Sequence, residues 1–212
     1  MAALALAAFA DLINAAEVEF TLEWNQQGLH TGSGDSHYAT RGVPLWRAKI
    51  TSPPMPNASA LGLMALVNSL QGGLGTFLLY DKRLPYPSSD PTGSIFGAAT
   101  PVVGTITDNV TVAFTGFPNN YVIPLGTYFQ IIHDTTRHYV GQFAEAKTAN
   151  GSGAVSASKV TPPLPDSVDS ADAVTVLKPS GKFRLEPNTA YLTNVGLVNA
   201  SIVLSAKQTY DA

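Results

Sequence analysis

Hydrophobic and polar residues alternate strictly near the start of the chain. Between residues 17 and 24 every second side chain is apolar, and Glu17, Glu19 and Glu23 occupy the alternate positions. This period of two predicts a half-buried strand with an acidic outer face. A second strand is predicted over residues 43–51, because Trp46, Ala48 and Ile50 share one face of an extended chain.

The spacing of apolar residues then changes to that of a helix. Leu63, Leu66, Val67 and Leu70 stand at i, i+3, i+4 and i+7, which predicts one apolar helical stripe packed on a sheet. Asn57 or Ser59 is the expected N-cap, and Gly72-Gly73 the expected end, because glycine adopts the left-handed cap conformation at little cost. Residues 76–80 are almost all apolar and predict a short buried strand.

Short strands separated by turn signals follow, and no second helical pattern accompanies them. Seven such strands with frequent turns are typical of a small β-barrel or sandwich. They are expected at residues 102–107, 110–114, 128–132, 139–143, 154–160, 173–177 and 182–185.

The last apolar segment indicates how the chain is divided. Residues 197–210 read as a further strand, which a barrel already closed would leave uncovered, so we expect it to return to the N-terminal sheet. The fold is therefore predicted to be mainly β with one or two short helices. An α+β domain, with a helix on a sheet, would comprise residues 1–95 and 189–212. A small barrel or sandwich would be inserted at residues 96–188.

Two polar stretches interrupt the pattern. Residues 25–42 are rich in glycine and predict a long loop or loose hairpin, and segments of this length in a compact domain usually serve function or assembly. Residues 82–97 contain three prolines and read as a crossing between domains. We expect the first stretch to form a subunit interface, with contacts from Gln26, His30, Tyr38 and Arg41.

Composition changes this picture in one respect. Charged residues are only 13% of the chain, about half the usual share. So few charges favour a surface covered by other subunits over the alternative of a soluble β-rich protein with Ser, Thr and Asn on its surface. The net charge of −3 argues against broad nucleic-acid binding, and the absence of cysteine excludes disulfides and thiolate zinc sites.

The apolar N-terminus has two interpretations. Residues 1–10 lack the basic start of a signal peptide and are too short to span a bilayer, which takes about 20 apolar residues. We therefore expect an alanine-rich helix or an ordered arm, and no membrane span. A cleaved signal is the alternative.

Candidate catalytic and metal-binding groups are few. His133 and His138 flank one predicted turn and could be two metal ligands, with Asp134 or a loop residue as the third. A clear third and fourth ligand at a fixed spacing are lacking, so surface histidines are favoured. His30 and His37 lie near Asp35 in the glycine-rich stretch without the sharp nucleophile turn of a hydrolase. The three glutamates of the first strand could mimic the carboxylates of a glycosidase, although a solvated face accounts for them as well.

Exposed aromatic residues offer the remaining chemistry. Trp24, Trp46, Tyr38, Tyr86 and Tyr121 could line a sugar-binding face, although core packing is the favoured interpretation of both tryptophans. We expect no catalytic residue, no cofactor, no metal and no enzyme activity.

Several motifs occur in the order found in one known family. They are PLWRA at 44–48, LQGGLGTFLLYD at 70–81, LGTYFQI at 125–131, RHYV at 137–140, ANGSGA at 149–154 and TPPL at 161–164, followed by the segment 174–185. Between about residues 19 and 185 the chain resembles the tail-tip and baseplate proteins of long-tailed bacteriophages, of the distal tail protein type. Each motif is degenerate, so the order and spacing carry the resemblance. The apolar first 15 residues and the loop at 25–42 depart from the family pattern.

The resemblance implies a structural virion protein located at the phage tail tip and assembled in the bacterial cytoplasm. It implies a homo-oligomeric ring, expected to be a hexamer with a trimer as the alternative. The implied partners are the tail tube, tail hub, tape measure and receptor-binding or fibre proteins. Two alternatives stay open: a carbohydrate-binding, host-adhesive β module, and another tail component such as the tube or terminator protein.

Overall fold

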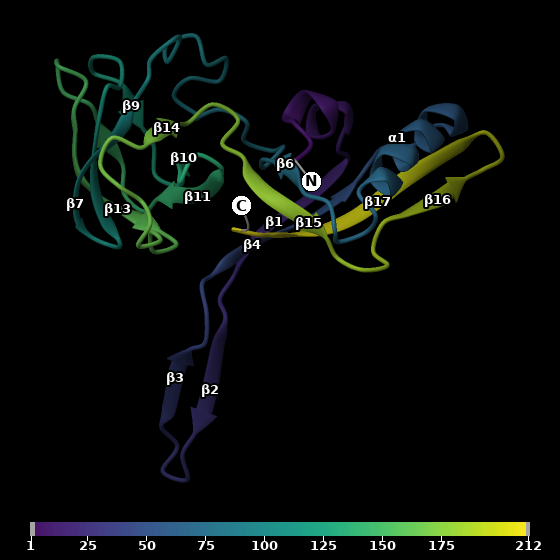
Figure 1. Ribbon diagram of the computed structural model, residues 1–212, viewed down its shortest axis with the longest axis horizontal. Coiled ribbons are helices and arrows are strands. Elements are labelled where there is room, and N and C mark those ends of the chain that lie inside the picture. The colour runs from purple at the N-terminus through teal and green to yellow at the C-terminus, as the bar shows by residue number, and fades with distance from the viewer. Residues whose placement is uncertain (1–2, 211–212) are drawn as a thin grey trace. The chain divides into compact units, whose positions relative to one another are not determined.

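The computed structural model describes residues 3–210, and the chain forms two units, each with its own core. The sheet unit comprises residues 12–76 and 183–209. The barrel unit comprises residues 3–11, 77–182 and 210. The mainly β fold expected from the sequence is confirmed, with α1 (Asn57–Ser69) as the α-helix among the described residues (Figure 1).

The sheet unit is an antiparallel sheet in the order β1-β4-β17-β15, with β16 and β5 also paired to β17. The bounds are β1 (Glu17–Glu23), β4 (Leu45–Thr51), β5 (Met55–Pro56), β15 (Gly181–Leu185), β16 (Tyr191–Val195) and β17 (Asn199–Gln208). Both strands predicted from the alternating pattern are confirmed. The last strand returns beside β4, as expected, with Ala206 opposite Ala48.

One face of the sheet forms the core of this unit. Trp46, Ala48 and Ile50 alternate inward along β4, as predicted, and Ile202, Leu204 and Ala206 do the same along β17. The Phe20 ring stacks on Trp46 with centroids 5.1 Å apart and meets Phe183 at 5.8 Å. Aromatic contacts of this kind bury large apolar areas, so the inward face stabilises the sheet unit.

The ends of α1 differ from the expectation. The N-cap is Pro56, which makes no side-chain cap bond, and the Asn57 amide instead donates to the Leu197 carbonyl at 3.1 Å. Along the predicted stripe, Val67 and Leu70 are buried, whereas Leu63 and Leu66 are partly buried. After Leu70, Gln71 and Gly72 adopt φ values of 52° and 67°, so the left-handed turn begins one residue earlier than predicted.

The barrel unit contains a closed barrel in the order β10-β11-β13-β8-β7-β14, which confirms the barrel alternative. Its strands are β7 (Val102–Asp108), β8 (Thr111–Thr115), β10 (Tyr128–His133), β11 (Arg137–Phe143), β13 (Val155–Thr161) and β14 (Ala173–Thr175). Phe114, Phe129 and Phe143 fill the interior with centroids 4.8 to 5.5 Å apart. Beside the barrel, β9 (Val122–Ile123) pairs with β12 (Lys147–Thr148).

The N-terminal residues form an ordered arm within the barrel unit. Two short 3₁₀ helices, η1 (Leu6–Ala8) and η2 (Ala10–Leu12), replace the expected alanine-rich helix. The arm is held against β6 (Phe77–Leu79), because Leu78 N donates to Leu4 O at 2.9 Å and the Phe9 ring lies 4.5 Å from that of Phe77. No helix within residues 3–210 combines the length and apolar content that a membrane crossing requires.

One expectation needs correction, one strand was not predicted, and one pair of alternatives is decided. The segment 182–185 was expected in the barrel, but Phe183 to Leu185 pair with β17. Residues 191–195 form β16, which the sequence pattern did not predict. Of the two alternatives for residues 25–42, the hairpin is confirmed, with β2 (Gln26–His30) paired to β3 (Ser36–Thr40).

The unit boundaries also differ in detail from the expected domains. Residues 3–11 and 77–95 belong to the barrel unit, whereas the sequence pattern had assigned them to the N-terminal domain. Residues 183–188 belong to the sheet unit and had been assigned to the insertion.

Candidate assembly surface

The hairpin β2–β3 pairs only with itself among the described strands (Figure 1). Five residue pairs join its strands, from Gln26 opposite Thr40 to His30 opposite Ser36, and all ten residues are exposed. At its foot, Arg41 N donates to Asn25 O at 2.7 Å, so the hairpin is tied where it leaves β1 and β4.

Local contacts explain why this glycine-rich stretch becomes a hairpin. The Tyr38 ring lies across the ladder beside Gly28, where a Cβ atom would approach the ring to 3.1 Å. An aromatic residue that covers a cross-strand glycine restores packing that the glycine lacks. At the turn, Thr31 N donates to Asp35 O at 2.9 Å, and Gly34 takes φ +89°.

The four residues expected at an interface lie on this hairpin or directly beside it. Gln26, His30 and Tyr38 share one face, because paired residues point the same way and the faces alternate along each strand. On that face, His30 Nδ1 lies 2.9 Å from Ser36 Oγ. Arg41 follows β3 at the foot and does not extend the row of the other three.

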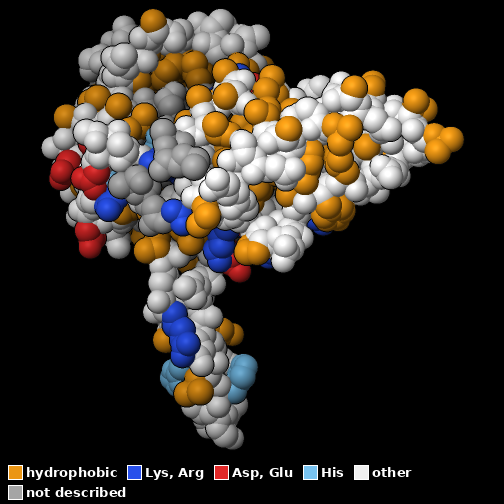
Figure 2. Space-filling view, turned by 45° about the vertical axis from the view of Figure 1, so that its right-hand side comes forward, with side chains coloured by type: hydrophobic (Ala, Val, Ile, Leu, Met, Phe, Trp, Pro, Cys, Tyr) orange, Lys and Arg blue, Asp and Glu red, His pale blue; other side chains and the backbone are white. Residues whose placement is uncertain are grey.

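An isolated two-stranded hairpin is at best marginally stable in water. This one has Tyr38 70% exposed on one face and Leu29 64% exposed on the other, and neither side chain is covered by another described element. Figure 2 shows its histidine and hydrophobic side chains at the surface. The hairpin therefore presents an apolar side chain on each face that another chain could cover.

A second exposed apolar surface lies at the turn between β16 and β17. Leu197 is 98% exposed and Val198 73% exposed, and hydrophobic side chains gather over this part of the sheet unit in Figure 2. The turn is anchored, because Asn57 N donates to Val198 O at 3.0 Å and the Asn57 amide donates to Leu197 O. Exposed apolar residues on a backbone held in place are typical of an interaction surface. Sequence reasoning missed this turn, because it predicted a single strand there.

The outer face of the sheet unit is polar and internally compensated. Lys207 Nζ lies 2.7 Å from Glu23 Oε2, and this contact lowers the pKa of Glu23. Arg47 pairs with Glu186 at 2.8 Å, and Lys49 lies 3.9 Å from Glu19. Because Glu19 and Glu23 of the predicted acidic face have partners in the same sheet, this face suits water better than an apolar partner.

The barrel unit holds the predicted His133 and His138 on opposite faces of one ladder. His133 is opposite Arg137, and His138 is opposite Ile132, so the two side chains point to different sides. Gln130 Nε2 lies 2.8 Å from His138 Nδ1. The two histidines are therefore not brought together as metal ligands. Within residues 3–210, no group of three or more His, Cys, Asp or Glu side chains is arranged to hold a metal ion.

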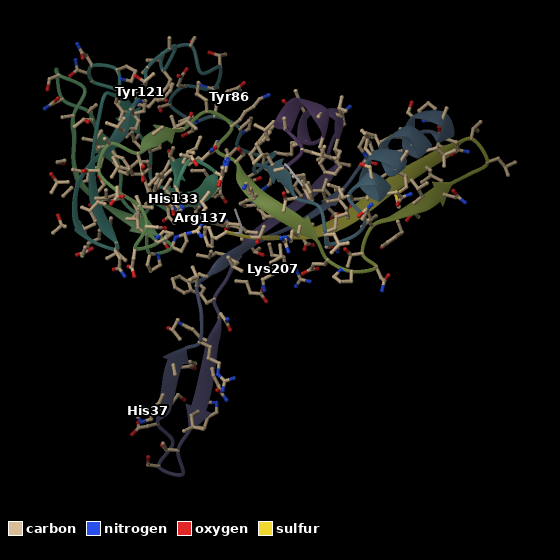
Figure 3. The ribbon with its side chains drawn as sticks, viewed as in Figure 1. His37, Tyr86, Tyr121, His133, Arg137 and Lys207 are labelled. Carbon is tan, nitrogen blue, oxygen red and sulfur yellow. The ribbon has the colours of Figure 1, made fainter. Side chains whose placement is uncertain are left out.

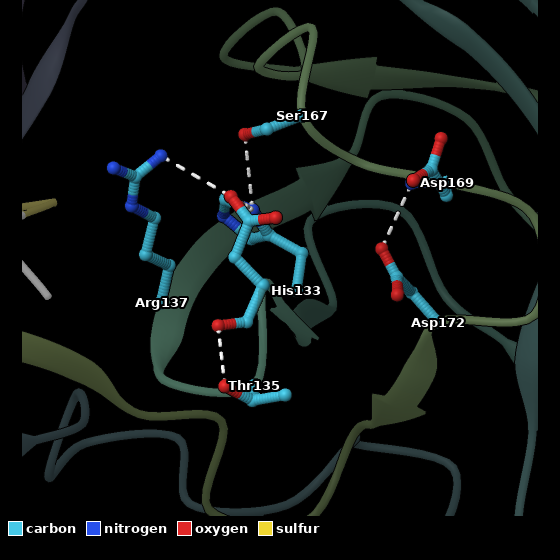
Figure 4. A network of polar contacts seen from close by, with 7 residues as sticks. His133, Thr135, Arg137, Ser167, Asp169 and Asp172 are labelled. Atoms are coloured by element: carbon cyan, nitrogen blue, oxygen red, sulfur yellow. Dashed lines mark hydrogen bonds and ion pairs between the residues drawn. The ribbon is translucent and has the colours of Figure 1, made fainter.

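His133 is part of a small polar network at one end of the barrel (Figure 4). Its Nδ1 atom lies 3.1 Å from Ser167 Oγ and 3.7 Å from Asp134 Oδ2, and Arg137 Nη1 lies 3.2 Å from the same carboxylate. The imidazole is 1% exposed, and burial lowers its pKa. Its Nε2 atom is buried and has no hydrogen-bond partner among the described residues.

The aromatic residues considered for sugar binding do not form one face. Trp46 and Tyr121 are buried, and Tyr121 packs against Phe96 and Phe117. Figure 3 labels Tyr86 and Tyr121 in the barrel unit, whereas Tyr38 lies on the hairpin of the sheet unit. Trp24 is 47% exposed, which contradicts its expected place in the core.

No protein-family model matches the chain, and no curated protein sequence matches it.

Proposed function

We propose that this chain is a structural subunit of a phage tail tip, and that it forms a ring with copies of itself. The observation that carries the proposal is the hairpin β2–β3, whose ten residues are all exposed and, among the described strands, pair only with one another. In a ring, a neighbouring subunit would cover Tyr38 and Leu29 and so stabilise a hairpin that is marginal alone.

Two further features support assembly. The anchored turn at Leu197 and Val198 offers a second apolar contact, and the chain carries few charges to keep copies apart. The partners implied by the motif order are the tail tube, tail hub, tape measure and receptor-binding or fibre proteins. The expected location is the virion, and the expected ring is a hexamer with a trimer as the alternative.

The test compares the mass of the full chain with that of a variant in which residues 26–40 are replaced by a short Gly/Ser turn. We expect the full chain to form rings, measured by light scattering after gel filtration and seen by negative-stain microscopy. The shortened variant should be monomeric and should unfold at the same temperature, because the hairpin contributes nothing to the core of the sheet unit. Lys49→Ser on the outer face of the sheet is the matched control and should still form rings.

A full chain that stays monomeric at high concentration, with no rings in the images, would exclude the proposal. If rings form, the number of copies per virion separates the remaining alternatives. A tail-tip ring requires few copies, whereas a tube protein requires hundreds.

A further inference from the structure

The barrel unit carries a surface groove of ≈ 870 Å³ over β7, β8 and β13. This volume lies within the range of small-molecule binding sites, about 300–1,000 Å³. Within residues 3–210, no charged side chain lines the groove. Its lining residues are Gly104, Thr105, Ile106, Ala113, Phe114, Thr115, Thr148, Asn150, Ala154, Val155, Ser156 and Ser170.

The groove lies where two ladders of the barrel lose regular register. Between β7 and β8 the pairing shifts between Val103 and Ile106, and between β8 and β13 it shifts between Val155 and Ser158. Thr105 and Ser156 belong to these irregular segments, one on each side of β8. Irregular pairing of this kind redirects side chains and occurs often beside binding sites.

The hydroxyl groups in the groove are not used by the protein. The side chains of Thr105, Thr115, Thr148, Ser156 and Ser170 make no hydrogen bond to another residue within 3–210, so all five can serve a ligand. All five residues are exposed. Thr105, Thr115, Thr148 and Ser156 lie on strands, and Ser170 lies in the loop before β14. Asn150 Oδ1 accepts from the backbone N–H groups of Ser152 and Ala154, which holds this side-chain amide in place.

We propose that this groove binds an uncharged sugar chain. Hydroxyl groups both donate and accept hydrogen bonds, as sugar hydroxyls do, so the two sets can pair without leaving a group unsatisfied. The C–H faces of a sugar ring can pack on Ile106, Ala113 and Ala154, which line the same groove as the hydroxyl groups. A charged ligand would find no counter-charge here, and an apolar one would bury the five hydroxyls without partners, which is costly.

This site is independent of the ring proposed above, because every lining residue belongs to the barrel unit and none to the hairpin. It also differs from the aromatic sugar face considered from the sequence. Phe114 lines the groove but is buried in the barrel core, so the partly exposed aliphatic side chains provide the apolar contact.

The experiment titrates the full chain with neutral oligosaccharides, namely maltohexaose, cellohexaose and chitohexaose, and with heparin as the charged comparison. Calorimetry gives the affinity for each sugar. NMR of the methyl groups of Ile, Val and Ala shows where on the chain the sugar binds, and it can be applied whether the protein is a monomer or a ring. We expect at least one neutral sugar to bind and to shift the methyl signals of Ile106, Ala113 and Val155. Heparin should leave these three signals unchanged.

The double variant T105A/S156A removes one hydroxyl from each side of β8 and should weaken binding about tenfold or more. T107A is the matched control, because Thr107 is an exposed threonine two residues further along β7 that does not line the groove. Its affinity should stay within about twofold of the original. If no neutral sugar moves the three methyl signals, or if T105A/S156A binds as tightly as T107A, the proposal is wrong. Ring formation is unaffected by either result, so the two proposals fail separately.

Discussion

At the residue scale, His133 links burial in the barrel to the pH dependence of stability. Burial lowers its pKa below the ordinary value of 6.5, against the opposing effects of Asp134 and Asp172, and Arg137 adds to the lowering. Below about pH 6.5 the unfolded chain binds a proton that the folded barrel excludes, so the free energy of unfolding must fall as the pH falls. Burial also lowers the pKa of His138, which adds to the same slope.

We therefore expect the free energy of unfolding to decrease between pH 7.5 and 5.5, and to decrease less steeply in His133→Gln. Urea denaturation at a series of pH values measures both slopes. His37→Gln, on the exposed hairpin, is the control and should keep the original slope (Figure 3). Equal slopes in the original chain and His133→Gln would contradict the assignment of the proton to His133.

Single residues also show how far local pattern can predict a structure. Trp46 and Trp24 both stand on apolar positions of an alternating strand, yet Trp46 is 2% exposed and Trp24 is 47% exposed. The pattern predicts which face a residue occupies but not where the core ends, and Trp24 lies beyond the last pair of β1 with β4. Asn57 is similar, because its amide bonds to a carbonyl 140 positions away that no local rule could identify.

At the scale of one element, the turn between Asn150 and Ala154 offers a sharp comparison of two glycines. Gly153 has φ +75°, and a Cβ atom there would lie 2.1 Å from the Phe117 carbonyl oxygen. Gly151 has nothing within 4 Å of the same position. We expect Gly153→Ala to destabilise the barrel by roughly 2 kcal/mol or more and Gly151→Ala to change stability by less than about 0.5 kcal/mol. Thermal and urea unfolding of both variants measure this difference, and equal stabilities would show that the turn can relax.

Elements with a regular pattern and a local partner were predictable from the sequence, and those that depend on distant pairing were not. β1, β4, α1 and most barrel strands follow from alternation, helical spacing and turn residues. β15 is a short segment in which Phe183 and Leu185 alternate with Lys182 and Arg184, a pattern that suits a barrel or a sheet equally. Its pairing with β17 decides between them. The hairpin was obscured by its glycines, because the packing of Tyr38 beside Gly28 becomes evident only once the strands are in register.

The residues of the candidate assembly surface also divide into those that could be predicted from the sequence and those that could not. Gln26, His30, Tyr38 and Arg41 could be selected from a glycine-rich stretch, because long polar insertions are often assembly segments. Leu197 and Val198 could not, since an apolar pair in a predicted strand is expected to be buried. The phage tail function stays a prediction from motif order, and the hairpin gives it a structural test.

At the scale of the whole molecule, the two cores lead us to expect two unfolding transitions. Both tryptophans of the chain belong to the sheet unit, so tryptophan fluorescence reports on that unit alone. Tyr80, Tyr121, Tyr128 and Tyr139 are buried in the barrel unit, so we expect them to dominate the near-ultraviolet signal of tyrosine. Because each unit encloses its own hydrophobic core, the two signals should change at different urea concentrations.

Gly153→Ala separates the transitions further, because its effect is confined to a turn of the barrel unit. In that variant the tyrosine transition should move to lower urea, and the fluorescence transition should stay in place. Gly151→Ala should move neither. Coincident curves in the original chain, or a shift of both signals in Gly153→Ala, would mean that the sheet and barrel units unfold as one cooperative structure. The insertion of residues 77–182 would then have to be understood as part of a single domain.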